Sequence, residues 1–469
     1  MHAMKQAEAL LPQCHAAMYQ WDGIWQELCL SDPLVRDHVG TIAKFNGEPN
    51  AGFFSVRDYP LTCRSVPSRS EETALQETIA LVLRANPALL YLHVPFCDSG
   101  CTYCHFYRSG SKQSRCISRY VETVCSRAYQ LRSAIGPFKI PSIYIGGGSP
   151  SLLSSREMSM VLETYLDTVC NNHPREIAIE VDPLHITRLK LEQLRESGIT
   201  RVSMGVQSFD EESLAILGRR HTPSQAGIAL DLAKDLGFQV SLDIMYGFPG
   251  LTPSALARTV DAVIHASPDQ ISVYRLSLHI GTSLTRLFSE CGLMNEPWIA
   301  TAQHRLIDTR LVAEGYWSYT AQDYTKNQAD TYNFQTWNNS NCIGIGPSAR
   351  SYLSGLHFCD EPDVATFATT RRQPISIHRF NQLPRDEQLR RALVLGFKGG
   401  SVAVDKLKVE YPYEFSPELD AALSRLESQQ AIKRTNGEYG LTDLGRMFFW
   451  IVSRGFFSQE YISDLENHA

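Results

Sequence analysis

The sequence predicts an α/β protein built around a partial (β/α) barrel, with an N-terminal extension and a small, helical, winged-helix-like C-terminal domain. Two observations support this fold class. Short segments rich in β-branched and apolar residues alternate with longer segments of helical periodicity, which is the pattern of repeated β-α units around a parallel sheet. In addition, the most distinctive motifs follow the ends of predicted strands, where parallel β/α folds bind their ligands.

Six strands and four helices make up the predicted barrel. The strands are expected at residues 89–94, 142–145, 177–181, 201–206, 239–244 and 270–276. Helices are expected at residues 117–133, 155–170, 223–236 and 253–265, where apolar side chains recur at intervals of three and four. We therefore expect a (β/α)6 partial barrel over residues 86–315. A segment that closes the barrel and contacts the substrate is expected over residues 316–384.

An N-terminal extension is predicted for residues 1–85. This part of the chain has few strand patterns, and the run Phe45 to Gly52 is rich in the residues that favour loops. The extension precedes the first predicted strand, and the sequence gives it no role of its own.

A separate C-terminal domain is predicted for residues 385–469. Helices expected at residues 386–397 and near 417–429 precede a hairpin closed by Asn436 and Gly437, a pair that favours a two-residue turn. Helices followed by such a hairpin resemble a winged helix. Winged helices often bind DNA, but the mixed charge of this segment argues against DNA binding.

Composition and charge fit an enzyme in a reducing compartment. The chain has 469 residues, of which 43% are hydrophobic and 20% charged, and its net charge of −6 provides no field for attracting nucleic acid. Nine of its twelve cysteines are scattered without the spacing of a disulfide framework. Neither a signal-like N-terminus nor an apolar run long enough to span a membrane is found. We expect a cytoplasmic protein without nucleic-acid or membrane partners.

Cys97, Cys101 and Cys104 form the most informative motif. Three thiolates spaced C-x3-C-x2-C can bind three irons of a [4Fe–4S] cube and leave the fourth iron open. Electron-transfer clusters usually take four cysteines, so the triplet favours a cluster that binds a substrate or a cofactor. The alternative is a zinc site, which would need a fourth ligand such as His93, His105 or a distant cysteine.

The cysteine motif and its surroundings resemble the radical S-adenosylmethionine (SAM) superfamily. Within it, they resemble the branch named after oxygen-independent coproporphyrinogen III oxidase. The resemblance covers residues 89–350 and rests on motifs in the same order at residues 91–97, 144–151, 180–183, 201–209 and 243–250. It implies a partial barrel, a [4Fe–4S] cluster and SAM as cofactors, and a one-electron reductant such as flavodoxin or ferredoxin.

The resemblance also implies a set of SAM-binding residues. They are Tyr91, Gly146, Gly147, Gly148, Ser149, Glu180, Gln207, Arg219 and Asp243. The glycines would let backbone groups approach the methionine part of SAM, and Glu180 would accept hydrogen bonds from the ribose or the amine. Arg219 is a candidate clamp for the carboxylate, but the adjacent Arg220 is an equal candidate. No further catalytic residue is assigned.

Three departures from the family pattern bear on the reaction. Phe106 stands where the oxidase has a further cysteine, which argues against porphyrinogen decarboxylation. The related haem chaperone has a His-Asn pair followed by an aromatic-Trp pair, whereas this chain has Tyr332-Asn333 and Thr336-Trp337. Haem ligation through that motif is therefore not expected. His93 is an alternative haem ligand, although in the family pattern it looks structural.

Carbon methyl transfer is the reaction that the sequence favours. Phe106 and the run Gly344 to Ala349 are compatible with relatives that use two SAM molecules, one as the radical source and one as the methyl donor. Their substrates are planar, so we expect a (hetero)aromatic or tetrapyrrole acceptor. Porphyrinogen oxidation and non-catalytic haem binding remain as alternatives.

Overall fold

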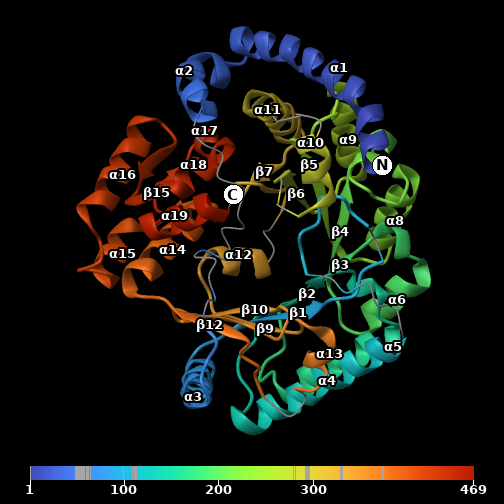
Figure 1. The fold of residues 1–469 in the computed structure, drawn as a ribbon, viewed down its shortest axis with the longest axis vertical. Helices are drawn as coiled ribbons and strands as arrows, with labels where there is room; N and C mark the ends of the chain where they lie inside the picture. The colour runs from blue at the N-terminus through green and yellow to red at the C-terminus, as the bar shows by residue number, and fades with distance from the viewer. Residues whose placement is uncertain are drawn as a thin grey trace.

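The fold is described from a computed structural model over residues 2–47, 59, 63, 65–98, 100–107, 109, 114–277, 279, 281–290, 296–327, 331–370 and 374–468. Its centre is a twelve-stranded sheet with the order β12-β11-β10-β9-β1-β2-β3-β4-β5-β6-β8-β7 (Figure 1). The six predicted strands are present and parallel, as β1 (Leu89–Val94), β2 (Ser142–Gly147), β3 (Glu176–Val181), β4 (Arg201–Gln207), β5 (Gln239–Tyr246) and β6 (Gln270–Arg275).

The sheet curves without closing, as a partial barrel does. Its first and last strands, β12 and β7, lie at opposite ends of the strand order. The parallel ladder is regular from β1 to β4, and its register shifts between Gly205 and Gln207 at the carboxyl end of β4. The predicted α/β fold class is therefore confirmed.

The four predicted helices are present and cover the barrel strands. They are α4 (Ser114–Ala134), α5 (Ser155–Thr168), α8 (Pro223–Asp235) and α9 (Pro253–Ala266). Ser154 and Thr222 start α5 and α8 with capping boxes, in which each hydroxyl oxygen accepts from a backbone N–H three residues later. Two further helices, α6 (Arg188–Glu196) and α7 (Glu211–Ile216), were not predicted.

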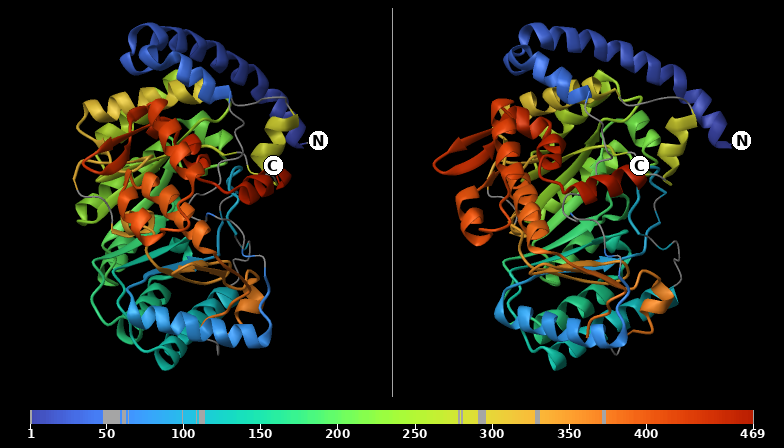
Figure 2. Two further views of the ribbon diagram at one scale, coloured as in Figure 1. Left: turned by 90° about the vertical axis from the view of Figure 1, so that its left-hand side faces the viewer. Right: turned by 60° about the vertical axis from the view of Figure 1, so that its left-hand side comes forward.

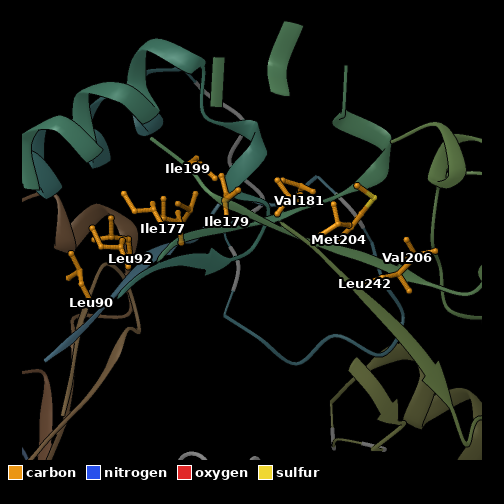
Figure 3. Close-up of a cluster of buried hydrophobic side chains, with 14 of the residues drawn as sticks. Leu90, Leu92, Ile177, Ile179, Val181, Ile199, Met204, Val206 and Leu242 are labelled. Atoms are coloured by element: carbon orange, nitrogen blue, oxygen red, sulfur yellow. The ribbon is translucent and has the colours of Figure 1, made fainter. Parts of the chain in front are cut away.

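Apolar and polar side chains alternate along the barrel strands, so that one face of the sheet packs against the helices and the other lines the interior of the barrel. Figure 3 shows nine labelled apolar side chains beside the helices that cover the sheet: Leu90, Leu92, Ile177, Ile179, Val181, Ile199, Met204, Val206 and Leu242. Successive residues of a strand point to opposite faces. Glu180, Ser203 and Asp243 lie between these apolar positions and line a cavity on the other face. Helix packing therefore orients the polar groups of the interior.

Much of the segment 316–384, which was expected to close the barrel, extends the sheet at both edges. Strands β7 (Trp317–Ser318) and β8 (Asp323–Thr325) follow β6, and β9 (Cys342–Ile345) pairs in parallel with β1. Antiparallel strands continue from β9 as β10 (Arg350–Leu353), β11 (Leu356–Cys359) and β12 (Arg379–Gln382). The remaining helices here are α12 (Thr331–Trp337) and α13 (Val364–Phe367), while α10 (Ser283–Glu290) and α11 (Pro297–Ala313) precede the segment.

The predicted N-terminal extension is helical and packs on the rest of the chain. It contains α1 (His2–Ser31), α2 (Pro33–Gly47) and α3 (Arg69–Ala85), and Figure 2 shows α1 and α2 along one end of the molecule. Trp21 is buried and donates from Nε1 to the carbonyl oxygen of Leu251 at 2.7 Å. Of the loop-like run at 45–52, residues 45–47 end α2, and the others lie outside the described residues.

The C-terminal region contains the expected helices and hairpin. Its helices are α14 (Arg385–Lys398), α15 (Val404–Glu410), α16 (Pro417–Ser428), α17 (Asp443–Met447), α18 (Phe449–Arg454) and α19 (Gln459–His468). Strands β13 (Ser401–Val402), β14 (Ile432–Thr435) and β15 (Glu438–Leu441) form a small antiparallel sheet. Asn436 and Gly437 have φ of 53° and 82°, as a type I′ turn requires. The division of the chain into four domains stays a prediction.

No helix of the described residues is both long and apolar enough to cross a membrane.

A buried ion pair joins α4 to the strands that extend the sheet. Arg127 is fully buried and donates to Asp360 and to the Thr370 hydroxyl, and its guanidinium lies 4.4 Å from the ring centroid of Phe367. Asp360 also accepts from the backbone N–H of Gly346 at 3.1 Å. Because both charges are out of water, each depends on the other for compensation.

We predict that Arg127→Met lowers the free energy of unfolding by about 3–5 kcal/mol, because it leaves the buried Asp360 carboxylate without its counter-charge. Urea denaturation would measure the loss. Arg36→Met is the control, since the Arg36–Asp37 pair is more than half exposed, at 53% and 56%, and an exposed ion pair contributes little to stability. Equal losses in the two variants would contradict the prediction.

Candidate active site

Most of the predicted site residues line one cavity of about 480 Å³. It opens at the carboxyl ends of the barrel strands and is also lined by residues of the cysteine loop and of the C-terminal region. Its volume lies in the range of pockets that bind small molecules. The cavity therefore brings together segments that are far apart in the sequence.

All three cysteines of the motif line this cavity. Cys101 is buried, and Cys97 and Cys104 are partly buried. The Ser149 hydroxyl donates to Cys97 Sγ at 3.6 Å, and Arg219 Nη1 donates to Cys101 Sγ at 3.3 Å. Donors aimed at sulfur stabilise thiolates, and such bonds tune iron–sulfur sites. The donor set therefore fits a cluster bound by three thiolates.

Within the described residues, no three His, Cys, Asp or Glu side chains surround a single point as ligands of one metal ion would. In an iron–sulfur cube each cysteine binds a different iron, so the three sulfur atoms need not converge on one point.

The Gly146–Gly148 turn packs directly against the cysteine loop. The backbone N–H of Gly148 donates to the Val94 carbonyl oxygen at 2.8 Å. A Cβ on Gly148 would lie 2.4 Å from the Phe96 oxygen, and one on Gly147, whose φ is +116°, would lie 2.7 Å from the Val94 oxygen. The glycines were expected to make room for a cofactor. Here, two of them make room for the backbone that carries Cys97.

Glu180 is held in place from the β2 side. Its carboxylate accepts from Tyr144 Oη at 2.9 Å and from the Gly147 N–H at 3.1 Å. A Cβ on Gly146 would lie 3.0 Å from that carboxylate, so Gly146 leaves space for it. Tyr91 stacks on Tyr144 with centroids 6.2 Å apart. Tyr91 and Gly146 are not among the residues that line the cavity, whereas Gly147, Gly148, Ser149 and Glu180 are.

Gln207 occupies a strained position at the end of β4. Its φ is +71°, which is uncommon for a residue with a side chain, and it follows the register shift of the β4–β5 ladder. Its side chain is 9% exposed and lines the cavity. Strain of this kind persists where the surrounding structure enforces it, and it is concentrated at functional sites.

The structure distinguishes Arg219 from Arg220. Arg219 lines the cavity, and its Nη2 donates to the Gly205 oxygen at 2.6 Å and pairs with Asp182 at 3.0 Å. The Arg220 side chain is 53% exposed and donates to the Asp98 oxygen at 2.9 Å. Arg219 is therefore the arginine of the site, and much of its hydrogen-bonding capacity is already used by protein groups.

Asp243 lines the cavity as predicted and is easily protonated. Burial, together with the negative charges of Glu180 and Asp323, raises the pKa of its carboxyl to about 8 against the opposing effect of Arg201. Near neutral pH, the Asp243 side chain is therefore a donor as well as an acceptor of hydrogen bonds.

His93 is a structural residue in this fold. Its Nδ1 lies 3.1 Å from Tyr91 Oη and its Nε2 lies 3.4 Å from the Tyr107 oxygen. Burial lowers the pKa of His93 to about 4, so the ring is neutral. Because both ring nitrogens have partners and His93 does not line the cavity, the geometry does not favour it as a haem ligand.

Other residues near the cavity were only partly anticipated. Phe106 is 60% exposed, lines the cavity and stacks on His105 with centroids 4.7 Å apart. Trp337 also lines the cavity, whereas Tyr332 is buried against Tyr144 at a centroid distance of 4.7 Å. The run 344–349, expected to lie near the substrate, does not contribute to the wall.

Sequence reasoning missed Asp182 and Lys398. Both line the cavity. Asp182 belongs to the same motif as Glu180, and its charge next to a conformation-restricting proline was a usable signal. Lys398 ends a helix of the C-terminal region, and no sequence pattern connects it with the cysteine motif.

Comparison with known proteins places these features in a family. A sequence profile of the radical SAM superfamily matches residues 91–263. The haem chaperone HemW of Mycobacterium tuberculosis is 33% identical over 290 residues, which are 60% of this chain and 74% of that protein. HemW of Bacillus subtilis is 24% identical over 363 residues, which are 76% of this chain and 96% of that protein.

Proteins of the oxidase type are also similar. Oxygen-independent coproporphyrinogen III oxidase of Paracoccus denitrificans is 28% identical over 259 residues, which are 54% of this chain and 53% of that protein. The solved structure of coproporphyrinogen III oxidase (HemN) from Escherichia coli has a TM-score of 0.71 at 21% identity and covers 84% of this chain and 96% of that chain. The chain belongs to the radical SAM superfamily, whose cofactors are a [4Fe–4S] cluster and SAM, in the branch of coproporphyrinogen III oxidase and its haem-chaperone relatives.

Proposed function

We propose that this protein cleaves SAM reductively at a [4Fe–4S] cluster held by Cys97, Cys101 and Cys104, and that the radical acts on a planar substrate in the same cavity. One observation carries the proposal. The three cysteines share a cavity with polar strand-end side chains and with aromatic rings. A reduced cluster with SAM bound supplies the electron that splits SAM into methionine and a 5′-deoxyadenosyl radical.

The protein groups would bind and orient these partners. Ser149 and Arg219 donate to two of the cysteine sulfurs and would stabilise them as thiolates. Glu180, Gln207 and Asp243 would bind the polar groups of SAM, since each lines the cavity from the carboxyl-terminal half of a strand. Because Arg219 is already bound to Asp182 and Gly205, we propose that it positions the cysteine loop rather than clamping the SAM carboxylate.

A tetrapyrrole is the substrate class that we propose. The named relatives are haem chaperones and a coproporphyrinogen oxidase, and the aromatic rings of Tyr103, Phe106 and Trp337 line the cavity, where they can stack on a flat ligand and keep water from a radical.

For the reaction, carbon methyl transfer with two SAM molecules stays our first hypothesis because Phe106 replaces the further cysteine of the oxidase. The relatives support oxidative decarboxylation or haem binding at least as well. A flavodoxin or a ferredoxin would supply the electron in either reaction.

Anaerobic turnover with methyl-deuterated SAM and dithionite separates these reactions. Methyl transfer should give S-adenosylhomocysteine together with deuterated 5′-deoxyadenosine. Oxidase activity should release carbon dioxide from coproporphyrinogen III, and a chaperone should bind haem without turnover. Deoxyadenosine without any S-adenosylhomocysteine would rule out methyl transfer.

We predict that anaerobic reconstitution yields about four irons and four sulfides per chain. This iron and sulfide content should be lost in each of the variants Cys97→Ala, Cys101→Ala and Cys104→Ala. Chemical analysis of iron and sulfide, together with the visible absorbance of the iron–sulfur cluster, would measure the cluster content. Cys116→Ala, at a partly buried cysteine outside the motif, should retain the cluster. Full iron content in all three motif variants would contradict the proposal.

We predict that Asp243→Asn stabilises the SAM-free protein more at pH 8.5 than at pH 5. The folded state holds a proton on Asp243 up to about pH 8, whereas the unfolded chain releases it near the ordinary pKa. As the pH rises from the ordinary pKa of a carboxyl to about 8, the wild-type protein therefore loses stability. Asparagine does not titrate, so the variant is spared this loss.

Thermal unfolding at the two pH values would measure this difference, and isothermal titration should show weaker SAM binding by the same variant. Asp231→Asn, at an exposed position of α8, is the control and should have nearly the same effect at both pH values. If Asp243→Asn stabilised the protein equally at both pH values, the raised pKa of Asp243 would be contradicted.

A further inference from the structure

Lys398 is a buried cation that the proposed chemistry does not use. It ends α14, lines the cavity and is 3% exposed. Its carbonyl oxygen accepts from the Ala321 N–H at 3.1 Å, which fixes the backbone beside the cavity. The ammonium lies 5.4 Å from the ring centroid of Trp337 and 5.3 Å from that of Phe449.

The Lys398 ammonium makes cation–π contacts with these two rings, and it has no ion pair or hydrogen bond among the described residues. Asp323 is the carboxylate that favours its charged form, but Asp323 forms no ion pair with it and instead accepts from the Thr320 hydroxyl at 2.6 Å. Burial lowers the pKa of Lys398 to about 8. A buried ammonium without a paired anion is unfavourable. An anionic ligand in the cavity would compensate the charge of Lys398.

Two indole N–H groups of the same cavity are also without acceptors. Trp337 Nε1 and Trp450 Nε1 are buried, and neither has a hydrogen-bond partner among the described residues. Both tryptophans line the cavity with Lys398. Buried donors normally have acceptors. Because neither Nε1 atom is exposed to solvent, water does not satisfy these donors, and an acceptor from a bound ligand would relieve the cost of leaving them unpaired.

Charged side chains are distributed unevenly around the cavity. Among the described residues that line it, the carboxylates Glu180, Asp182 and Asp243 all lie on the barrel side, together with the cations Arg219 and Arg275. The C-terminal region contributes the cations Lys398, Arg446 and Arg454, so an anionic group of a substrate would be attracted to that part of the wall.

We propose that Lys398, with the indole N–H groups of Trp337 and Trp450, binds a carboxylate of the substrate and so orients the planar ring in the cavity. The inference rests on the proposed function, because it assigns a property to the substrate of the same site. Tryptophan faces suit a flat ring, and the ammonium suits its carboxylate. Lys398 is thus a specificity-determining residue, not a group that touches the reacting atoms.

The test compares acid and ester forms of two flat ligands on the anaerobically reconstituted protein, followed by tryptophan fluorescence. The ligands are coproporphyrin III with its tetramethyl ester, and naphthalene-2,6-dicarboxylate with its dimethyl ester. The wild type should bind each acid at least about tenfold more tightly than its ester, as expected for a charged hydrogen bond. Lys398→Met should lose that preference, and Lys398→Arg should keep most of it.

Two further measurements make the test specific. Lys406→Met, at an exposed lysine of α15, should bind all four compounds as the wild type does. Lys398→Met should melt no lower than the wild type, because methionine removes an unpaired buried charge. A lower melting temperature with unchanged acid preference would show a structural lysine and overturn the proposal.

Failure of the tetrapyrrole assignment is distinguishable from failure of the anion site. If the wild type prefers the naphthalene dicarboxylate over its ester but binds neither porphyrin, the anion site stands and the tetrapyrrole substrate fails. If the wild type shows no preference for either acid, the proposal for Lys398 is wrong.

Discussion

The Arg219 guanidinium joins the cysteine loop to the ends of two barrel strands. It donates to Cys101 Sγ, donates to the Gly205 oxygen of β4 and pairs with Asp182, which follows β3. A charge buried this deeply is tolerated only with partners of this quality. The described residues of the cysteine loop form no helix and only an isolated bridge, so the position of the loop over the strand ends depends on contacts such as this one, on the hydrogen bonds of Thr102 to Ile216 and Leu217, and on the close approach of the glycine turn.

Local signals were sufficient for most of the barrel. The six strands have apolar, β-branched sequences, and the Asn436-Gly437 turn needs only two residues to specify it. Helix α6 escaped prediction because only Leu191 and Leu194 are buried on an otherwise polar surface. The edge strands β7 and β13 have two residues each, too few to show any period.

Site residues that belong to a sequence motif could be predicted. Site residues that come from distant segments and meet only in the folded protein could not. The cysteines follow β1, and Glu180, Gln207 and Asp243 lie in the carboxyl-terminal halves of β3, β4 and β5, so the parallel topology alone brings them to one cavity. Arg219 and Arg220 are neighbours in sequence, and only the course of the chain after Gly218, with φ of +67°, decides which of them faces inward. Lys398 reaches the cavity through the docking of α14, which no local pattern encodes.

The packing of α2 has a consequence for how the chain is made. Val35, Ile42 and Phe45 share a hydrophobic core with Leu389, Phe397 and Phe448, from the opposite end of the sequence. On the ribosome, this apolar face of α2 is synthesised long before the segments of α14 and α18 that cover it. Contacts between such distant segments slow folding, and the uncovered face is a site of aggregation in the meantime. Until α14 and α18 are in place, α2 therefore exposes an apolar surface that the finished fold buries.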